Sequence, residues 1–163
     1  MARLLRRGPP RFLLFVCHGN ICRSPYAAKA LERLLGDGSG VRVESAGFVG
    51  PGRSAPPEGV TVGAARGVDL SRHRAKLLGP PDVLTADLVV VMDPWQRRAV
   101  SALYGRDERD IVVLGDLDPG PIETRAILDP VEQPASAFEA SYERIDRCLK
   151  ELVRATRGDA ARG

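Results

Sequence analysis

Cys17 and Arg23 stand six residues apart in a polar segment that could carry out nucleophilic chemistry on an oxyanion. The segment consists of Cys17-His18-Gly19-Asn20-Ile21-Cys22-Arg23-Ser24. A thiolate is a strong nucleophile, and a nearby cation or helix N-terminus favours that form of the thiol. The planar guanidinium of Arg23 can bind two phosphate oxygens at once, and the hydroxyl of Ser24 can donate a hydrogen bond to the sulfur. These residue types predict a phosphate-binding loop with Cys17 as its nucleophile.

The residues on either side predict that this segment leaves a buried strand and enters a helix. Residues 12–16 form a short continuous apolar run, typical of a parallel strand that is buried on both faces. On the far side, Ser24 suits a helix N-cap, Pro25 the first helical position and Gly36 the end of the helix. A loop that enters a helix in this way points backbone N–H groups inward, and the helix N-terminus adds positive potential. Such a loop is suited to holding an anion.

A second cysteine and arginine with the same spacing show that the surrounding residues matter. Cys148 and Arg154 lie within an amphipathic helical pattern that has no glycine, no following serine and no preceding strand. Around Cys17 and Arg23 there are a glycine, a following serine and a preceding predicted strand. Gly19 and Asn20 also tolerate the positive φ that a tightly curled loop requires. The prediction therefore concerns Cys17, and Cys148 is expected to be a core residue.

The rest of the chain alternates predicted strands and helices. Further strands are expected at residues 41–45, 88–92 and 111–114, and further helices at residues 60–67, 94–104 and 137–157. This alternation predicts one α/β domain spanning residues 1–163, with a parallel sheet whose ligands bind beyond the carboxyl ends of the strands. Residues 1–10 and 157–163 are expected to be flexible tails.

The composition argues against several classes of protein. The chain has 163 residues, 44% hydrophobic and 28% charged, which suits one soluble domain. No apolar run is long enough to cross a membrane, and the basic N-terminus lacks the apolar core of a signal peptide, so a cytoplasmic protein is expected. The 24 basic residues are spread along the chain, which disfavours nucleic-acid binding. Three cysteines in a chain of this size do not indicate a disulfide scaffold.

The segment from Val16 to Pro25 resembles the signature loop of the low-molecular-weight protein tyrosine phosphatases. Later motifs resemble those of the family in the same order, so that the likeness covers nearly the whole chain: Ser45-Ala46-Gly47, Asp69-Leu70-Ser71-x-His73-x-Ala75, Val91-Met92-Asp93 and Ile127-Leu128-Asp129-Pro130. Membership would imply a three-layer fold of the phosphotyrosine protein phosphatase I type, with a four-stranded parallel sheet in the order 2-1-3-4. It would also imply hydrolysis through a phosphocysteine intermediate on Cys17, with no metal and no cofactor.

A phosphatase needs a proton donor for the leaving group, and three Asp-Pro pairs compete for that role. Asp93 directly follows a predicted strand and precedes a helix, so an N-cap is expected there. Asp118 follows the fourth strand and suits a turn. Spacing alone does not separate Asp118 from Asp129, but the resemblance assigns the general acid to Asp129.

The resemblance also assigns supporting roles around the loop. A hydrogen-bond network that holds the loop in shape is expected from Asn20, Ser24, Ser45 and His73. Cys22 is expected to form a protective disulfide with Cys17 under oxidation, and the alternative is a small buried hydrophobic residue. No catalytic role is expected for His18. The cysteines and histidines lack the spacing of metal ligands, so no metal site is expected.

The expected substrate is a phosphorylated protein, with a tyrosine kinase as one candidate, and the enzyme is expected to be a monomer. Several family members have an aromatic wall beside the active site. Here fewer aromatic residues predict a more open cleft, with a rim formed by Phe48, Val131 and Glu132. Ile21 stands where a phosphoarginine-specific branch carries threonine, which favours phosphotyrosine.

Three alternatives stay open: a protein-arginine phosphatase, a thioredoxin-coupled arsenate reductase and a non-catalytic anion-binding module. Arsenate reductases of similar fold relay a disulfide through cysteines outside the loop, and Cys148 is the one candidate in this sequence. The presence of Cys17, Arg23 and Asp129 argues against a non-catalytic module.

Overall fold

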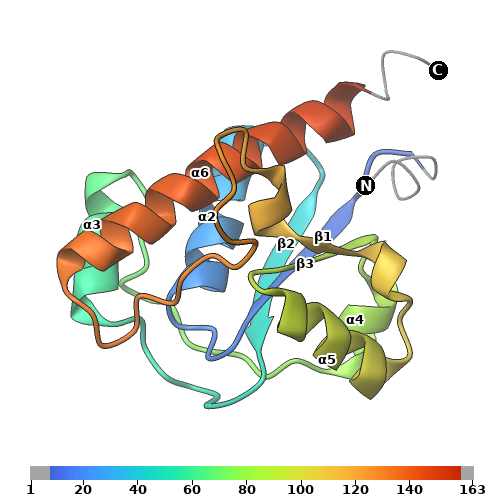
Figure 1. Ribbon diagram of the computed structural model, residues 1–163, viewed down its shortest axis with the longest axis horizontal. Helices are drawn as coiled ribbons and strands as arrows, with labels where there is room; N and C mark the ends of the chain where they lie inside the picture. Colours follow the sequence, from blue (N-terminus) through green and yellow to red (C-terminus); the bar gives the residue numbers. More distant parts are fainter. Residues whose placement is uncertain (1–7, 159–163) are drawn as a thin grey trace.

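A four-stranded parallel sheet forms the centre of the computed structural model, which describes residues 8–158 (Figure 1). The strands are β1 (Phe12–Cys17), β2 (Arg42–Gly47), β3 (Leu88–Val91) and β4 (Ile111–Val113). They are hydrogen-bonded in the order β2-β1-β3-β4, and all three pairings are parallel. This order confirms the 2-1-3-4 topology that the resemblance implied.

Helices cover both faces of the sheet and complete three layers (Figure 1). They are α2 (Arg23–Leu35), α3 (Pro57–Ala65), α4 (Pro80–Thr85), α5 (Pro94–Tyr104) and α6 (Ala135–Gly158). α2, α3 and α6 pack together on one face, and α4 and α5 lie on the other. Within residues 8–158 no helix is long and apolar enough to cross a membrane.

The alternation of side chains along β1 explains why that strand is apolar throughout. Leu13 and Phe15 belong to the core beneath α2 and α6, whereas Leu14 and Val16 belong to the core beneath α4 and α5. Successive side chains of a strand point to opposite faces, so a strand covered on both faces needs an unbroken apolar run. Cys17 continues the alternation toward the α2 face.

Several boundaries differ from those that the sequence predicted. α3 spans Pro57–Ala65 instead of residues 60–67, and α6 begins at Ala135 instead of residue 137. The short helix α4 was not predicted at all, although Pro80 stands at its start, where proline's fixed φ suits a helix. Most residues of the two expected tails lie outside the described part of the chain, and α6 continues through Gly158.

The long segment between β4 and α6 is tied down by an arginine of α6. Arg144 donates hydrogen bonds to the carbonyl oxygens of Thr124 and Ala126, at 2.5 and 2.7 Å. Its Nε also lies 3.0 Å from Oδ2 of Asp118, in an ion pair whose side chains are 15% and 5% exposed. Buried charges need such partners, so this arginine fixes the path of the segment.

The end of this segment is held against the sheet. The N–H of Ile127 donates to the carbonyl of Met92 at 2.9 Å, directly after β3, and the Ile127 side chain is fully buried. The hydroxyl of Ser141, in α6, donates to the carbonyl of Leu128 at 2.7 Å. These bonds bring Asp129, the next residue, to the carboxyl end of the sheet.

Gly47 ends β2 and faces the phosphate-binding loop without room for a side chain. An added Cβ would lie 2.8 Å from the backbone N of Asn20 and 2.9 Å from the carbonyl oxygen of His18. We therefore expect Gly47→Ala to lower the free energy of unfolding by about 1–3 kcal/mol, because the loop backbone must shift. Urea denaturation measures this change.

The matched control is Gly79→Ala, because the nearest atom to a Cβ there is a proline carbon at 3.8 Å. That variant should change stability by less than about 0.5 kcal/mol. Equal stability of the two variants would contradict the close packing of β2 against the loop.

Candidate active site

The phosphate-binding loop joins β1 to α2, and the helix begins earlier than the sequence suggested. α2 starts at Arg23, with Cys22 at the N-cap position and no side chain capping it. The prediction of Ser24 as the N-cap was therefore wrong. The Ser24 hydroxyl is instead hydrogen-bonded to the sulfur of Cys17, 3.0 Å away, within the protein interior. A hydroxyl in contact with the sulfur can stabilise a negative charge there.

The curl of the loop depends on Asn20. This residue has a φ of 52°, in the left-handed region that asparagine tolerates better than most residues. Gly19 does not use a positive φ, although the sequence suggested that it would. A Cβ there would lie 2.6 Å from Nη2 of Arg53, at the end of a flexible side chain.

The side chain of Asn20 is the centre of a buried hydrogen-bond network. Its Nδ2 donates to the hydroxyl oxygens of Ser24 and Ser45, both at 2.8 Å. Its Oδ1 accepts from the backbone N–H of Lys76 at 2.8 Å. The structure thus brings together Asn20, Ser24 and Ser45 from three separate elements.

His73 contacts the backbone of Asn20. Its Nε2 lies 2.6 Å from the carbonyl oxygen of Asn20, and because a carbonyl can only accept, this nitrogen must carry the proton. Burial lowers the pKa of the His73 imidazole, and the hydrogen bond to Asn20 opposes that shift. A neutral imidazole protonated on Nε2 satisfies both observations.

Cys17 and Cys22 lie in the same loop but in different surroundings. Both are buried, and the hydrogen bond to Ser24 belongs to Cys17. Burial, together with the negative charge of Asp129, raises the pKa of the Cys22 thiol to about 12. Cys22 is therefore a protonated thiol at neutral pH.

Arg23 links the loop to Asp129. Its Nη1 donates to the carbonyl of Ile127 at 2.9 Å, and its Nη2 lies 3.2 Å from Oδ2 of Asp129. The arginine side chain is only 6% exposed, whereas that of Asp129 is 35% exposed. Nε of Arg23 is buried without a hydrogen-bond partner in the described structure.

The three Asp-Pro pairs have separate environments. Asp93 caps α5 by accepting the backbone N–H of Trp95 at 3.0 Å, as predicted. The side chain of Asp118 is 5% exposed between Arg144 and Arg147, and the hydrogen bond from Arg147 is the main cause that lowers its pKa. Only Asp129, of these three, lines the pocket that contains Cys17.

This pocket has a volume of about 160 Å³ at the carboxyl end of β1. Its lining combines the loop with residues from two other segments: Cys17, His18, Gly19, Ile21, Cys22, Val49, Arg53, Asp129 and Val131. Val49 and Arg53 were not identified from the sequence. The one available signal was that both follow β2, whose carboxyl end meets that of β1 in a parallel sheet.

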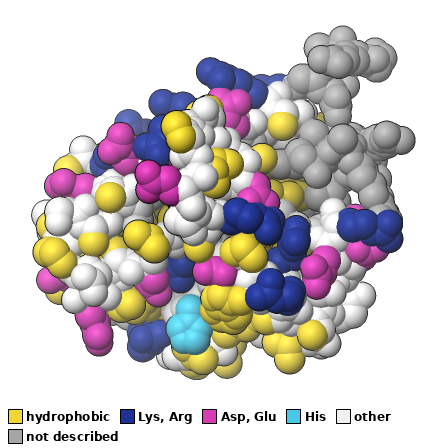
Figure 2. Space-filling model, viewed as in Figure 1, with side chains coloured by type: hydrophobic (Ala, Val, Ile, Leu, Met, Phe, Trp, Pro, Cys, Tyr) yellow, Lys and Arg dark blue, Asp and Glu magenta, His cyan; other side chains and the backbone are white. Residues whose placement is uncertain are grey.

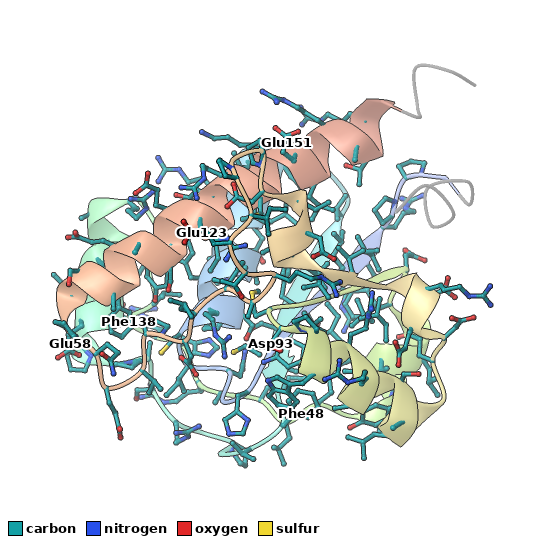
Figure 3. The ribbon with its side chains drawn as sticks, in the orientation of Figure 1. Phe48, Glu58, Asp93, Glu123, Phe138 and Glu151 are labelled. Carbon is teal, nitrogen blue, oxygen red and sulfur yellow. The ribbon has the colours of Figure 1, made fainter. Side chains whose placement is uncertain are left out.

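The three expected rim residues are placed differently from one another. Val131 lines the pocket, but Phe48 and Glu132 do not. Phe48 lies at the α4 and α5 face of the sheet, near the start of α5 (Figure 3), and packs there against Trp95. Phe48 follows the last residue of β2, and its side chain packs on the core beneath α4 and α5, whereas the next residue, Val49, lines the pocket. Glu132 is exposed and has a φ of 60°.

Cysteines and histidines outside the loop form no second centre in the described structure. Cys148 is fully buried in the core under α6, and burial raises the pKa of its thiol to about 12. Within residues 8–158 no group of three or more His, Cys, Asp or Glu side chains could hold a metal ion.

The raised pKa values of two thiols give a prediction for alkylation. Cys22 and Cys148 have pKa values of about 12, so both stay protonated and unreactive at pH 7 to 8. We expect iodoacetamide to modify Cys17 in the folded protein and to leave the other two thiols intact, as measured by peptide mass spectrometry. All three should react in urea. Labelling of Cys22 as fast as Cys17 in the folded state would contradict the prediction.

Comparison with known proteins agrees with this geometry. A family model described as low molecular weight phosphotyrosine protein phosphatase matches residues 12–161. The probable low molecular weight protein-tyrosine-phosphatase EpsP of Ralstonia nicotianae is 38% identical over 142 residues, covering 86% of this chain and 92% of the relative. The human low molecular weight phosphotyrosine protein phosphatase is 32% identical over 149 residues, with coverage of 86% and 92%.

Solved structures are similar over almost the whole chain. The tyrosine phosphatase AmsI of Erwinia amylovora superposes with a TM-score of 0.80 at 28% identity, covering 90% of this chain and 93% of that chain. The arginine phosphatase YwlE of Geobacillus stearothermophilus has a TM-score of 0.82 at 26% identity, with coverage of 94% and 97%. Sequence, fold and the geometry around Cys17 agree, and the chain belongs to the low molecular weight phosphotyrosine protein phosphatase family.

Proposed function

We propose that this protein hydrolyses phosphotyrosine in phosphorylated proteins through a phosphocysteine intermediate on Cys17. The observation that carries the proposal is that one small pocket at the end of β1 is lined by Cys17 and Asp129, while Arg23 contacts Asp129. A nucleophile and a carboxyl group in one pocket, with a guanidinium in contact with that carboxyl group, are the parts that phosphoryl transfer to a thiol requires.

The phosphate is held by the loop and by Arg23. The loop enters the N-terminal end of α2, where unpaired backbone N–H groups and the helix dipole favour an anion. The unpartnered Nε of Arg23 adds a charged donor from within the protein. A solved relative, Wzb of Vibrio vulnificus, is in complex with benzylphosphonate, which supports an oxyanion site in this fold.

The chemistry takes two steps. In the first, the Cys17 thiolate forms a bond to phosphorus, the bond from phosphorus to the tyrosine oxygen breaks, and the carboxyl of Asp129 donates a proton to that oxygen. In the second, the Asp129 carboxylate takes a proton from water as the water oxygen attacks phosphorus, and phosphate leaves the sulfur. The Ser24 hydroxyl, 3.0 Å from the sulfur, stabilises the thiolate at the start and at the end of the cycle.

The pocket wall favours an aryl leaving group over a guanidinium. Ile21, Val49 and Val131 present aliphatic side chains around the mouth of the pocket, which suit the flat apolar faces of a tyrosine ring. A phosphoarginine side chain would bring N–H groups that these residues cannot pair. The similarity to the arginine phosphatase YwlE makes phosphoarginine the second candidate substrate.

Arsenate reduction is the less suitable chemistry for this chain. A disulfide relay needs a further accessible cysteine, but Cys148 is fully buried in the core. Cys22 lines the pocket together with Cys17, which supports a reversible disulfide that protects the nucleophile from further oxidation. We further propose that the enzyme acts in the cytoplasm as a monomer, with a tyrosine kinase among its candidate substrates.

Replacing the proposed general acid should slow the chemical step most for substrates whose leaving-group oxygen needs a proton. We expect Asp129→Ala to lower kcat on a phosphotyrosine peptide by about 100-fold or more, because general acids contribute this much with poor leaving groups. The loss should be smaller on para-nitrophenyl phosphate, whose leaving group is less basic. Steady-state kinetics measure both values.

Asp118→Asn is the matched comparison, since Asp118 lies outside the pocket and pairs with Arg144 and Arg147. This variant should lower the melting temperature, whereas its kcat should change little. An equal loss of kcat in this variant, with the fold intact, would remove Asp129 from its assigned role.

Ile21 provides a test of the substrate class. Ile21→Thr adds a hydroxyl to the pocket wall, which can pair with a guanidinium and weakens the apolar contact with a tyrosine ring. We expect the ratio of kcat/KM for phosphoarginine peptides to that for phosphotyrosine peptides to rise about tenfold, a change of roughly 1.4 kcal/mol. Higher activity of the unaltered enzyme on phosphoarginine than on phosphotyrosine would favour the second candidate.

A further inference from the structure

A tryptophan stands exposed beside the active-site pocket. Trp95 is the only tryptophan of the sequence and lies at the start of α5, with 40% of its surface exposed. Its ring centroid is 6.0 Å from that of His18 and 5.4 Å from that of Phe48. His18 also lines the pocket above Cys17. His18, Phe48 and Trp95 therefore form an aromatic patch that is continuous with the pocket.

The aromatic patch is held in place by the elements beneath it. The backbone N–H of Trp95 donates to the side chain of Asp93 at 3.0 Å, and the buried Gln96 accepts the N–H of Met92 at 2.8 Å. These bonds fix the first turn of α5 at the end of β3. Phe48 packs on the core beneath α5. The backbone that carries the tryptophan is thus fixed, and its ring lies against those of His18 and Phe48.

The exposure of this side chain has no evident role in the fold. The cap at Asp93 uses only the backbone of Trp95, so a polar residue could start α5 as well. Val49, which is 43% exposed, extends the apolar surface along the pocket itself. Figure 2 shows hydrophobic side chains gathered beside a histidine on one face of the molecule. Exposed apolar surface next to a catalytic pocket indicates a contact with the substrate.

We propose that the aromatic patch binds an apolar side chain of the protein substrate, close in sequence to the phosphorylated tyrosine. The inference rests on the proposed function, since it assumes that the phosphate group occupies the pocket. An extended chain advances about 3.3–3.6 Å per residue, so the patch suits a side chain roughly two or three positions from the phosphotyrosine. Leucine and aromatic residues fit such a surface best.

The first test compares two phosphotyrosine peptides that differ only in carrying phenylalanine or serine at the positions roughly two and three residues from the phosphotyrosine. The enzyme should show a kcat/KM about tenfold higher for the phenylalanine peptide, and Trp95→Ala should abolish that preference. Trp95→Phe should restore part of it. The matched control Leu103→Ala alters an exposed side chain of the same helix, and it should leave the preference intact.

The outcomes separate this inference from the proposed function. Failure to hydrolyse para-nitrophenyl phosphate or either peptide would reject the function itself. Hydrolysis of both peptides with equal kcat/KM would reject the aromatic patch while leaving the phosphatase intact. An equal loss by Trp95→Ala on both peptides and on para-nitrophenyl phosphate would show that the residue only supports the fold.

A second readout uses the fluorescence of the single tryptophan. In a Cys17→Ser protein, which cannot turn over its substrate, the phenylalanine peptide should shift the emission of Trp95, whereas inorganic phosphate should leave it unchanged. The serine peptide should give a smaller shift. If the Trp95 emission spectrum changes with protein concentration in the absence of peptide, a second copy of the chain covers the aromatic patch. That result would overturn the proposal.

Discussion

The buried amide of Asn20 is the interaction on which the shape of the phosphate-binding loop depends. It donates to Ser24 and Ser45 and accepts from the backbone of Lys76, while His73 holds the Asn20 carbonyl. Leaving one such buried group unpaired would cost about 1–3 kcal/mol. These bonds therefore sustain a backbone with a φ of 52° that few residues adopt without strain. They also connect the loop to β2, to α2 and to the segment that precedes α4.

A second link joins the loop to the long segment between β4 and α6. Arg23 binds the carbonyl of Ile127 and contacts the carboxylate of Asp129, and Arg144 fixes the same segment from α6. The proposed acid is therefore positioned by the same guanidinium that is proposed to bind phosphate. Its carboxylate is more exposed than the guanidinium, which leaves it open to a substrate at the pocket mouth.

The sequence predicted the parts of this molecule that depend on local pattern. The apolar run of β1, the cap at Asp93 and the left-handed Asn20 follow from residue type and neighbours, and the structure confirms them. The sheet order, and the network with Ser45 and His73, came from the family resemblance. Spacing along the chain does not show which distant segments meet.

The sequence was least informative about the direction in which side chains point. Ser24 has the residue type of an N-cap, yet the helix begins two residues earlier than predicted, and the Ser24 hydroxyl contacts sulfur. Phe48 was expected at the pocket, but it packs on the core beneath α4 and α5, and the next residue, Val49, lines the pocket instead. Trp95 had no visible role until folding placed α5 beside His18. Such contacts depend on register and on packing between elements, which a single sequence does not contain.

The central claim is that the phosphoryl group passes through the sulfur of Cys17. Rapid acid quenching during turnover of a labelled phosphotyrosine peptide, followed by peptide mapping, tests this directly. We expect phosphate on the peptide that contains Cys17, at no more than one group per chain, and none in Cys17→Ser. Turnover that persists in Cys17→Ser, or label on any other residue, would contradict it.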